Sequence, residues 1–140
     1  MEIYRPKYFS PEELAPKELC LKKSSDEIFD LFDRGLLKAL DRVREKLGKP
    51  ITINNWRFGG QFSQRGIRTD PNVGAPKSAH RIGKALDFDA DGMSAEEVRQ
   101  WIIVHQKEFP EIRRMEAGVN WVHIDCVEHT HGADIYLFKA

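Results

Sequence analysis

Hydrophobic residues recur at helical spacing over one long stretch of the chain, between Ser24 and Gly48. The recurring positions are Ile28, Phe32, Leu36, Leu40, Val43 and Leu47. Ser24 and Glu27 are spaced as a capping box, in which a hydroxyl and a carboxylate satisfy free backbone amides at a helix start. The pattern predicts the main core helix. Gly35 inside it costs about 1 kcal/mol relative to alanine, so a break or kink near Gly35 is possible.

Two further helices are indicated by similar start signals. Ser10 stands before Pro11 and two glutamates, which predicts a short helix that begins there. Ser94 and Glu97 form a second capping box. The stripe that follows it consists of Val98, Trp101, Ile102 and His105, and the helix is expected to end by Phe109–Pro110.

Short strands are predicted where hydrophobic and polar residues alternate. The expected strands are Ile51–Asn54, Ala85–Asp89, Arg113–Ala117, Trp121–Val127 and Ile135–Phe138, with the third and fourth forming a hairpin around Gly118. Residues 57–77 are rich in glycine and polar side chains, so we expect a long functional loop there. Helices packed on a small, mainly antiparallel sheet give an α+β fold.

Length and composition suit one folded domain over residues 1–140, with 41% hydrophobic and 31% charged residues. The 22 basic residues balance the 22 acidic ones, so no net field draws the chain to nucleic acid, and we expect no nucleic-acid partner. Apolar runs are far shorter than the roughly 20 residues that cross a bilayer, so no membrane partner is expected. We expect a monomer.

The amino-terminal residues carry early charges and no hydrophobic stretch, so they do not resemble a signal peptide. The chain is therefore expected to be cytoplasmic as synthesised. Two cysteines cannot build a disulfide framework, so Cys20 and Cys126 are expected to be free thiols, with a single bridge between them as the alternative.

Histidines and aspartates gather in the carboxyl-terminal half of the chain. His80 lies seven residues before Asp87, which starts the polar face of the strand over 85–89. In the strand over 121–127, alternation puts His123 and Asp125 on one face with Trp121. Two nitrogens and one oxygen from three segments suit zinc, and three protein ligands leave one position for a water that the ion acidifies.

These residues resemble a known zinc signature. The two matching blocks are Ser78-x-His80-x-x-Gly83-x-Ala85-x-Asp87 and Trp121-x-His123-x-Asp125. They look like those of the M15 peptidases, the group of D-Ala-D-Ala carboxypeptidases and phage endolysin L-alanyl-D-glutamate peptidases. A Phe-Ser-x-x-Glu-Leu opening and a helix ending in Leu-Gly-Lys-Pro-Ile are similar to the phage-type branch. The resemblance implies one zinc on His80, Asp87 and His123, and an α+β fold shared with the hedgehog signalling domain.

The resemblance also implies roles for residues around the metal. The family's Ser-Gly-Tyr-Arg pattern corresponds here to Asn54-Asn55-Trp56-Arg57, so Arg57 is expected to steady the substrate carbonyl or carboxylate. Ser78 is a candidate to hydrogen-bond substrate, although capping a turn is an equally good interpretation. Asp125 is a candidate to orient a ligating histidine.

The general base departs from the family pattern. Well-known carboxypeptidase members carry a glutamate three residues before the last histidine ligand, and Asn120 stands there in this chain. Glu116 is the nearest substitute: a four-residue turn over 117–120 would pair it with Trp121 and place it on the face of His123. The other candidates are Glu128, His129 and His131.

Two hypotheses about function follow. The first is a zinc peptidase that cleaves the stem or cross-link peptides of peptidoglycan, or muropeptides. Three settings suit it equally: a phage endolysin released to the cell wall by lysis, a tail- or particle-associated enzyme, and an enzyme acting on cytosolic muropeptides. The alternative is an inactive zinc-containing module that binds wall peptide or a protein partner, which Asn120 favours. A globular protein without metal is a third interpretation.

Overall fold

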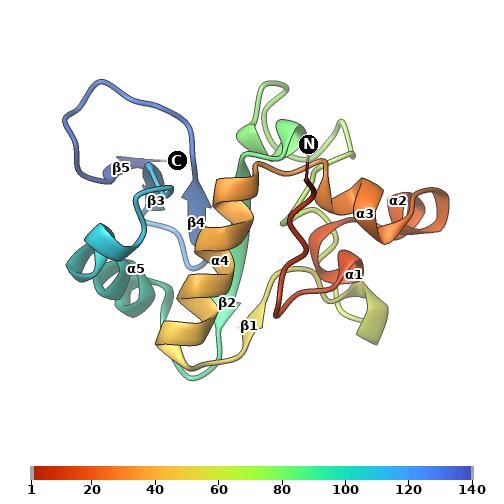
Figure 1. Ribbon diagram of the computed structural model, residues 1–140, viewed down its shortest axis with the longest axis horizontal. Helices are drawn as coiled ribbons and strands as arrows, with labels where there is room; N and C mark the ends of the chain where they lie inside the picture. The colour runs from red at the N-terminus through yellow and green to blue at the C-terminus, as the bar shows by residue number, and fades with distance from the viewer. Residues whose placement is uncertain (1, 140) are drawn as a thin grey trace.

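The computed structural model describes residues 2–139 of the chain. Its α-helices are α1 (Pro11–Leu14), α2 (Lys17–Lys22), α3 (Ser25–Phe29), α4 (Arg34–Leu47) and α5 (Ala95–Val104). Its strands are β1 (Ile51–Thr52), β2 (Ala85–Ala90), β3 (Arg114–Ala117), β4 (Val122–Asp125) and β5 (Tyr136–Lys139). Short 3-10 helices are η1 (Trp56–Phe58), η2 (Ala79–Ile82) and η3 (Gln106–Glu108). Figure 1 shows how these elements are arranged.

The strands form one sheet in the order β1-β2-β4-β3-β5. Three of the pairings are antiparallel, and β5 lies parallel to β3. The expected α+β fold with a mainly antiparallel sheet is therefore confirmed. β3 and β4 form the expected hairpin, and the strand predicted over 135–138 is β5.

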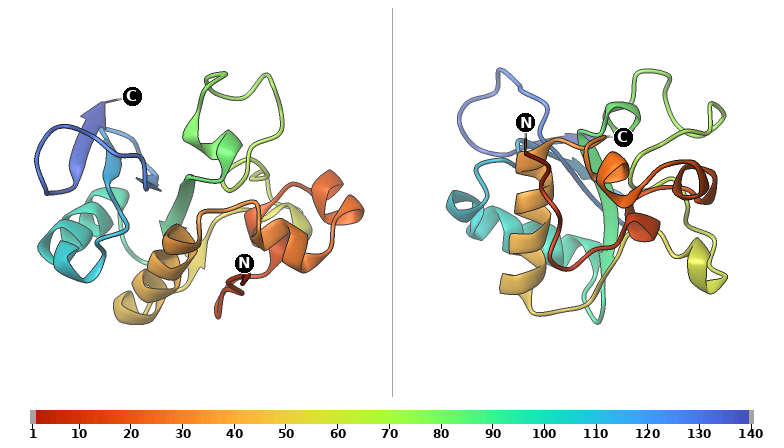
Figure 2. Two further views of the ribbon diagram at one scale, coloured as in Figure 1. Left: turned by 45° about the horizontal axis from the view of Figure 1, so that its top comes forward. Right: turned by 45° about the vertical axis from the view of Figure 1, so that its right-hand side comes forward.

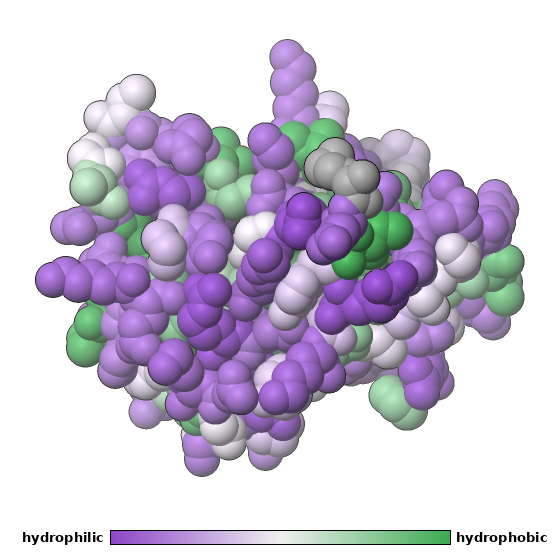
Figure 3. Space-filling view, in the orientation of Figure 1, coloured by the Kyte–Doolittle hydropathy of each residue, from purple (hydrophilic) through white to green (hydrophobic). Residues whose placement is uncertain are grey.

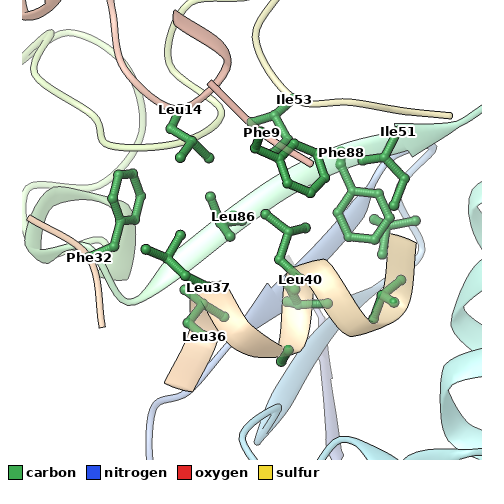
Figure 4. Packing of buried hydrophobic residues seen from close by; sticks show 14 of the residues in the cluster. Phe9, Leu14, Phe32, Leu36, Leu37, Leu40, Ile51, Ile53, Leu86 and Phe88 are labelled. Carbon is green, nitrogen blue, oxygen red and sulfur yellow. The ribbon is translucent and has the colours of Figure 1, made fainter. Parts of the chain in front are cut away.

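The hydrophobic core lies between α4 and the sheet. Leu37 and Leu40 on α4 face Leu86 and Phe88 on β2, and all four are fully buried (Figure 4). Because side chains alternate along a strand, the residues between them point to the opposite side of β2. In both views of Figure 2, α4 lies on one side of β2 and the loop leading into η2 lies on the other. Burying one face of β2 thus directs its aspartates toward that loop.

The predicted main helix is divided, and the division does not fall at Gly35. α3 ends at Phe29 and α4 starts after Asp33, whose side chain accepts a hydrogen bond from the Leu36 amide at 3.0 Å. The Asp33 amide in turn donates to the Gly83 carbonyl at 2.9 Å. Gly35 lies inside the first turn of α4. The hydrophobic spacing continues across the break because residues on both sides are buried in the same core.

Most of the surface shown in Figure 3 is hydrophilic, and hydrophobic side chains appear there as small separate patches. Cys20 and Cys126 are free thiols, as expected. Among the residues that the structure describes, no helix has both the length and the apolar character needed to cross a membrane.

Gly83 should be a sensitive position, because it joins η2 to β2 and packs against the break between α3 and α4. Its φ is +71°, and a Cβ added there would lie 1.9 Å from the Leu31 carbonyl oxygen. Gly92 has a similar φ of +75° with no atom within 4 Å of such a Cβ. We expect Gly83→Ala to lower the free energy of unfolding by about 1–3 kcal/mol more than Gly92→Ala in denaturant titrations. Equal losses in the two variants would contradict the close approach.

Candidate functional site

Three side chains from separate segments converge beside β2. His80 comes from η2, Asp87 from β2 and His123 from β4, and one ligand atom of each lies within 4.8 Å of the others. The antiparallel register of β2 and β4 sets Asp87 opposite His123. The three residues are 2%, 7% and 7% exposed. The structure therefore brings together the three residues that the sequence suggested as metal ligands.

His80 is oriented by the turn that carries it. Ser78 caps η2, and its hydroxyl accepts a hydrogen bond from the His80 amide at 3.3 Å. The ring Nδ1 lies 3.0 Å from the Gly66 carbonyl oxygen, which can only accept, so Nδ1 carries the proton. A Cβ on Gly66 would lie 2.0 Å from the Leu14 carbonyl oxygen, so glycine allows this close passage of the loop. His80 Nε2 is thereby directed at Asp87, 3.2 Å from Oδ1.

His123 is held between two carboxylates. Its Nδ1 lies 2.9 Å from Asp87 Oδ1, and its Nε2 lies 2.8 Å from Asp125 Oδ2. Asp125 is fully buried and receives three hydrogen bonds from Arg114, Nε to Oδ1 at 3.0 Å, Nε to Oδ2 at 3.1 Å and Nη2 to Oδ2 at 2.9 Å. The contact expected between Asp125 and a histidine of the site is thus present. This hydrogen bond fixes the His123 ring so that its Nδ1 faces Asp87.

Charges within the group stabilise one another in the metal-free chain. Burial lowers the pKa of the His123 imidazole, but hydrogen bonds to Asp125 and Asp87 outweigh burial and raise that pKa to about 9. Burial by itself raises the pKa of the Asp87 carboxyl. Hydrogen bonds with His123 and His80 outweigh burial and hold that pKa below its ordinary value. At neutral pH a proton therefore occupies His123. A metal ion that binds there must displace this proton.

The donor set fits zinc. Two imidazole nitrogens and one carboxylate oxygen are ligands that zinc takes, and ligands of a tetrahedral zinc at about 2.0–2.1 Å lie roughly 3.3 Å apart. The observed separations from Asp87 Oδ1 are 3.2 Å to His80 Nε2 and 2.9 Å to His123 Nδ1. Each histidine also gives its other ring nitrogen to an oxygen, Gly66 O or Asp125 Oδ2, as metal-ligating histidines generally do.

The group forms part of the wall of an open cleft of about 430 Å³. Besides His80, Asp87 and His123, the cleft is lined by Arg68, Lys77, Ser78, Arg114, Glu116, Trp121 and Phe138, together with residues 73–75 and 79. Three of these side chains are basic. The cleft therefore combines a metal-type donor set with several groups that attract negative charge.

Glu116 reaches the cleft through a register that differs from the predicted one. In the observed register of β3 and β4, Arg114 pairs with Asp125 and Met115 pairs with Ile124. Continued by one residue, this register sets Glu116 opposite His123 rather than Trp121. The predicted pairing was therefore wrong by two residues. A shift of two preserves the face of a strand, because side chains alternate with a period of two. Glu116 therefore lies on the face of His123, as predicted, and both residues line the cleft.

Arg57 does not lie in this cleft, so its expected placement is wrong. It belongs to η1, and its Nη1 pairs with Glu12 Oε1 at 3.2 Å while half of the side chain is exposed. It lines a separate surface hollow with Tyr8 and Phe58. The reason is local: β1 ends at Thr52, and the 3-10 turn that follows directs Arg57 toward α1 instead of toward β2.

Arg68 occupies the place expected for Arg57. Its side chain is 12% exposed, and its Nη2 lies 3.7 Å from Asp87 Oδ2. Its Nη1 donates to Ser78 Oγ at 3.3 Å. Partial burial lowers the pKa of this guanidinium below its ordinary value, and the nearby Asp87 carboxylate opposes that shift. Sequence reasoning missed Arg68 because it lies mid-loop with no periodic pattern; the only signal was a third arginine, after Arg57 and Arg65, before the ligand block.

The other candidate bases lie outside the cleft. Glu128 is 84% exposed and pairs with Arg113 at 3.8 Å. His129 and His131 stack with Tyr136, with 3.9 Å between the ring centroids of His131 and Tyr136. Among residues 2–139, the lining of the cleft includes none of these three side chains. The geometry therefore favours Glu116.

A sequence model of one protein family, Peptidase M15, matches residues 7–125. The matched range contains His80, Asp87 and His123 and ends at the last residue of β4. No curated protein and no solved structure matches the chain. The family match and the clustered donor atoms thus concern the same three side chains.

Replacing His123 by alanine should abolish stable zinc binding. Loss of an outer hydrogen-bond partner costs roughly 10- to 100-fold in metal affinity, and loss of a ligand should cost more. Zinc content after dialysis, measured by elemental analysis, should fall far below one ion per chain. His131→Ala removes an exposed imidazole outside the group and should keep its zinc. Full zinc occupancy in the His123 variant would remove this residue from the ligand set.

Proposed function

The chain belongs to the peptidase M15 family, a family of zinc-dependent metallopeptidases, and from this premise we propose that it hydrolyses peptides of the bacterial cell wall. The substrate class is the stem or cross-link peptide of peptidoglycan, or a muropeptide, with D-amino acids. The observation that carries the proposal is the His80, Asp87 and His123 group in the wall of a basic cleft.

The chain's own donors for zinc are His80 Nε2, an Asp87 carboxylate oxygen and His123 Nδ1. When bound, zinc would polarise the substrate carbonyl and lower the pKa of a water molecule. Gly66 and Asp125 keep the two rings in the orientation that this requires. To hold the ion, His123 Nδ1 would give up the proton that it shares with Asp87 Oδ1 in the metal-free chain.

Glu116 is the group that handles protons in this proposal. Its carboxylate stands across the β3–β4 hairpin from His123 and lines the same cleft. It accepts a proton from the attacking water and delivers it to the nitrogen of the leaving amine, which completes hydrolysis without another acid. Asn120 cannot accept a proton, so a base from β3 substitutes for it.

Arg68 and Ser78 act on the substrate. The partly buried Arg68 guanidinium, 3.7 Å from Asp87, offers charge-assisted hydrogen bonds where negative charge develops on a carbonyl oxygen, or where a carboxylate binds. Ser78 Oγ accepts from Arg68 and from the His80 amide, so it positions both residues. Lys77 adds positive charge to the same cleft, whereas the Arg114 guanidinium there is paired with Asp125. An anionic peptide fits these walls.

Asn120 supports one alternative, a module that holds zinc and binds wall peptide without cleaving it. This alternative predicts that zinc-loaded protein binds peptidoglycan fragments and releases no new amino groups. The proposed peptidase releases them.

Glu116→Gln separates these functions and tests the base. The amide cannot take up a proton, so we expect turnover to fall by about 10²-fold or more while zinc remains bound. The assay is the release of amino groups from peptidoglycan, with zinc content measured in parallel. Glu128→Gln removes an exposed carboxylate and should leave both quantities unchanged. Normal turnover in the Glu116 variant would transfer the role to another residue.

Arg68 and Arg57 can be compared directly, since the sequence and the structure point to different arginines. Arg68→Met should reduce kcat/KM by about 10²-fold, the usual cost of removing a charged or oxyanion-stabilising donor. Arg57→Met should change kcat/KM by less than about threefold, because its partner is Glu12 on the surface. A larger loss in the Arg57 variant would restore the assignment made from the sequence.

A further inference from the structure

A second hollow adjoins the cleft at the metal group. It measures about 420 Å³ and is lined by Gln61, Phe62, Arg65, Asp87, Asp89, Asn120 and Trp121. Asp87 and Trp121 also line the cleft, so these two residues form the boundary between the spaces. A peptide lying across Asp87 can therefore enter both.

The hollow and the cleft differ in charge. In the hollow, Arg65 Nη1 pairs with Asp89 Oδ2 at 3.0 Å, and the Arg65 guanidinium lies 4.1 Å from the centre of the Phe62 ring. These charges satisfy each other. The remaining lining consists of the Asp87 carboxylate and of two amides and two aromatic rings, from Gln61, Asn120, Phe62 and Trp121. Asp87 has cationic and imidazole partners of its own in His80, His123 and Arg68. The cleft carries the cations Arg68, Lys77 and Arg114 against the carboxylates Asp87 and Glu116, so cations outnumber carboxylates among its lining residues.

Hydrogen bonds from α5 hold the wall between the cleft and the hollow in place. Arg99 on α5 is 4% exposed, and its guanidinium donates to the carbonyl oxygens of Val119 and Trp121, each at 2.9 Å. These bonds fix the turn that carries Asn120 and Trp121. The indole Nε1 of Trp121 is buried with no hydrogen-bond partner among residues 2–139, so this wall has an unused donor. The hollow is a preformed feature of the fold.

We propose that this hollow is a second substrate subsite, which holds the uncharged peptide segment on the amino-terminal side of the scissile bond. The basic cleft then holds the carboxyl-terminal side, because a peptide carries its terminal carboxylate there. The two amides bind peptide groups, and the aromatic rings cover apolar atoms. The inference rests on the proposed function and adds a length requirement: the protein selects peptides longer than two residues.

The test compares two peptides that differ only on their amino-terminal side, acetyl-D-Ala-D-Ala and acetyl-Gly-Gly-D-Ala-D-Ala. Affinity for the zinc-loaded protein is measured by calorimetry, and cleavage is followed separately by amine release. We expect the longer peptide to bind at least about tenfold more tightly, a difference of roughly 1.4 kcal/mol. Equal affinities, or no detectable binding of either peptide, would overturn the inference.

Two variants locate the effect. Asn120→Trp fills the hollow from an exposed position and should remove most of the length advantage, while Gln61→Trp should do so from the opposite lining residue. Thr130→Trp adds the same side chain at an exposed site that lines neither space and should preserve the advantage. An advantage that survives both filling variants would also overturn the inference. Absence of cleavage with the length advantage intact would instead count against the proposed peptidase alone.

Discussion

The antiparallel pairing of β2 with β4 is the constraint on which the candidate metal centre depends. Its register sets Asp87 opposite His123, and packing of Leu86 and Phe88 against α4 keeps that register. A slip of one residue would turn Asp87 into the hydrophobic core and a large apolar side chain into the cleft. The hydrophobic core therefore determines the positions of the polar ligand atoms, although it does not touch the substrate.

A compact group of buried charges is costly unless each member has partners. Here the partners extend outward in two directions, from His80 to the Gly66 carbonyl and from His123 through Asp125 to Arg114. Each hydrogen bond satisfies a buried polar atom and also fixes the nitrogen that faces the group. The same contacts thus provide stability to the metal-free chain and orientation to the metal-binding one.

Loops on a rigid sheet supply the remaining chemistry. The segment between β1 and β2 is tied down by backbone hydrogen bonds, from Ile67 to Leu14 and from Asp87 to Arg65, both at 2.8 Å. It can therefore present Arg68 to the metal group with little freedom. Trp121, at the end of the β3–β4 turn, stands together with Asp87 between the cleft and the second hollow. Under the proposal that a peptide occupies both spaces, the cations of the cleft give that peptide a direction.

Much of the molecule followed from local sequence. Capping boxes, alternating strands and a hairpin glycine specify elements through neighbouring residues, so the α+β fold was predictable. The motif blocks around His80 and His123 resembled those of the family. Tertiary structure alone decided which arginine enters the cleft, which residue faces Glu116, and where the long helix divides. These outcomes depend on contacts between segments distant in sequence, such as Gly83 against the end of α3, and such contacts leave no periodic signal in the chain.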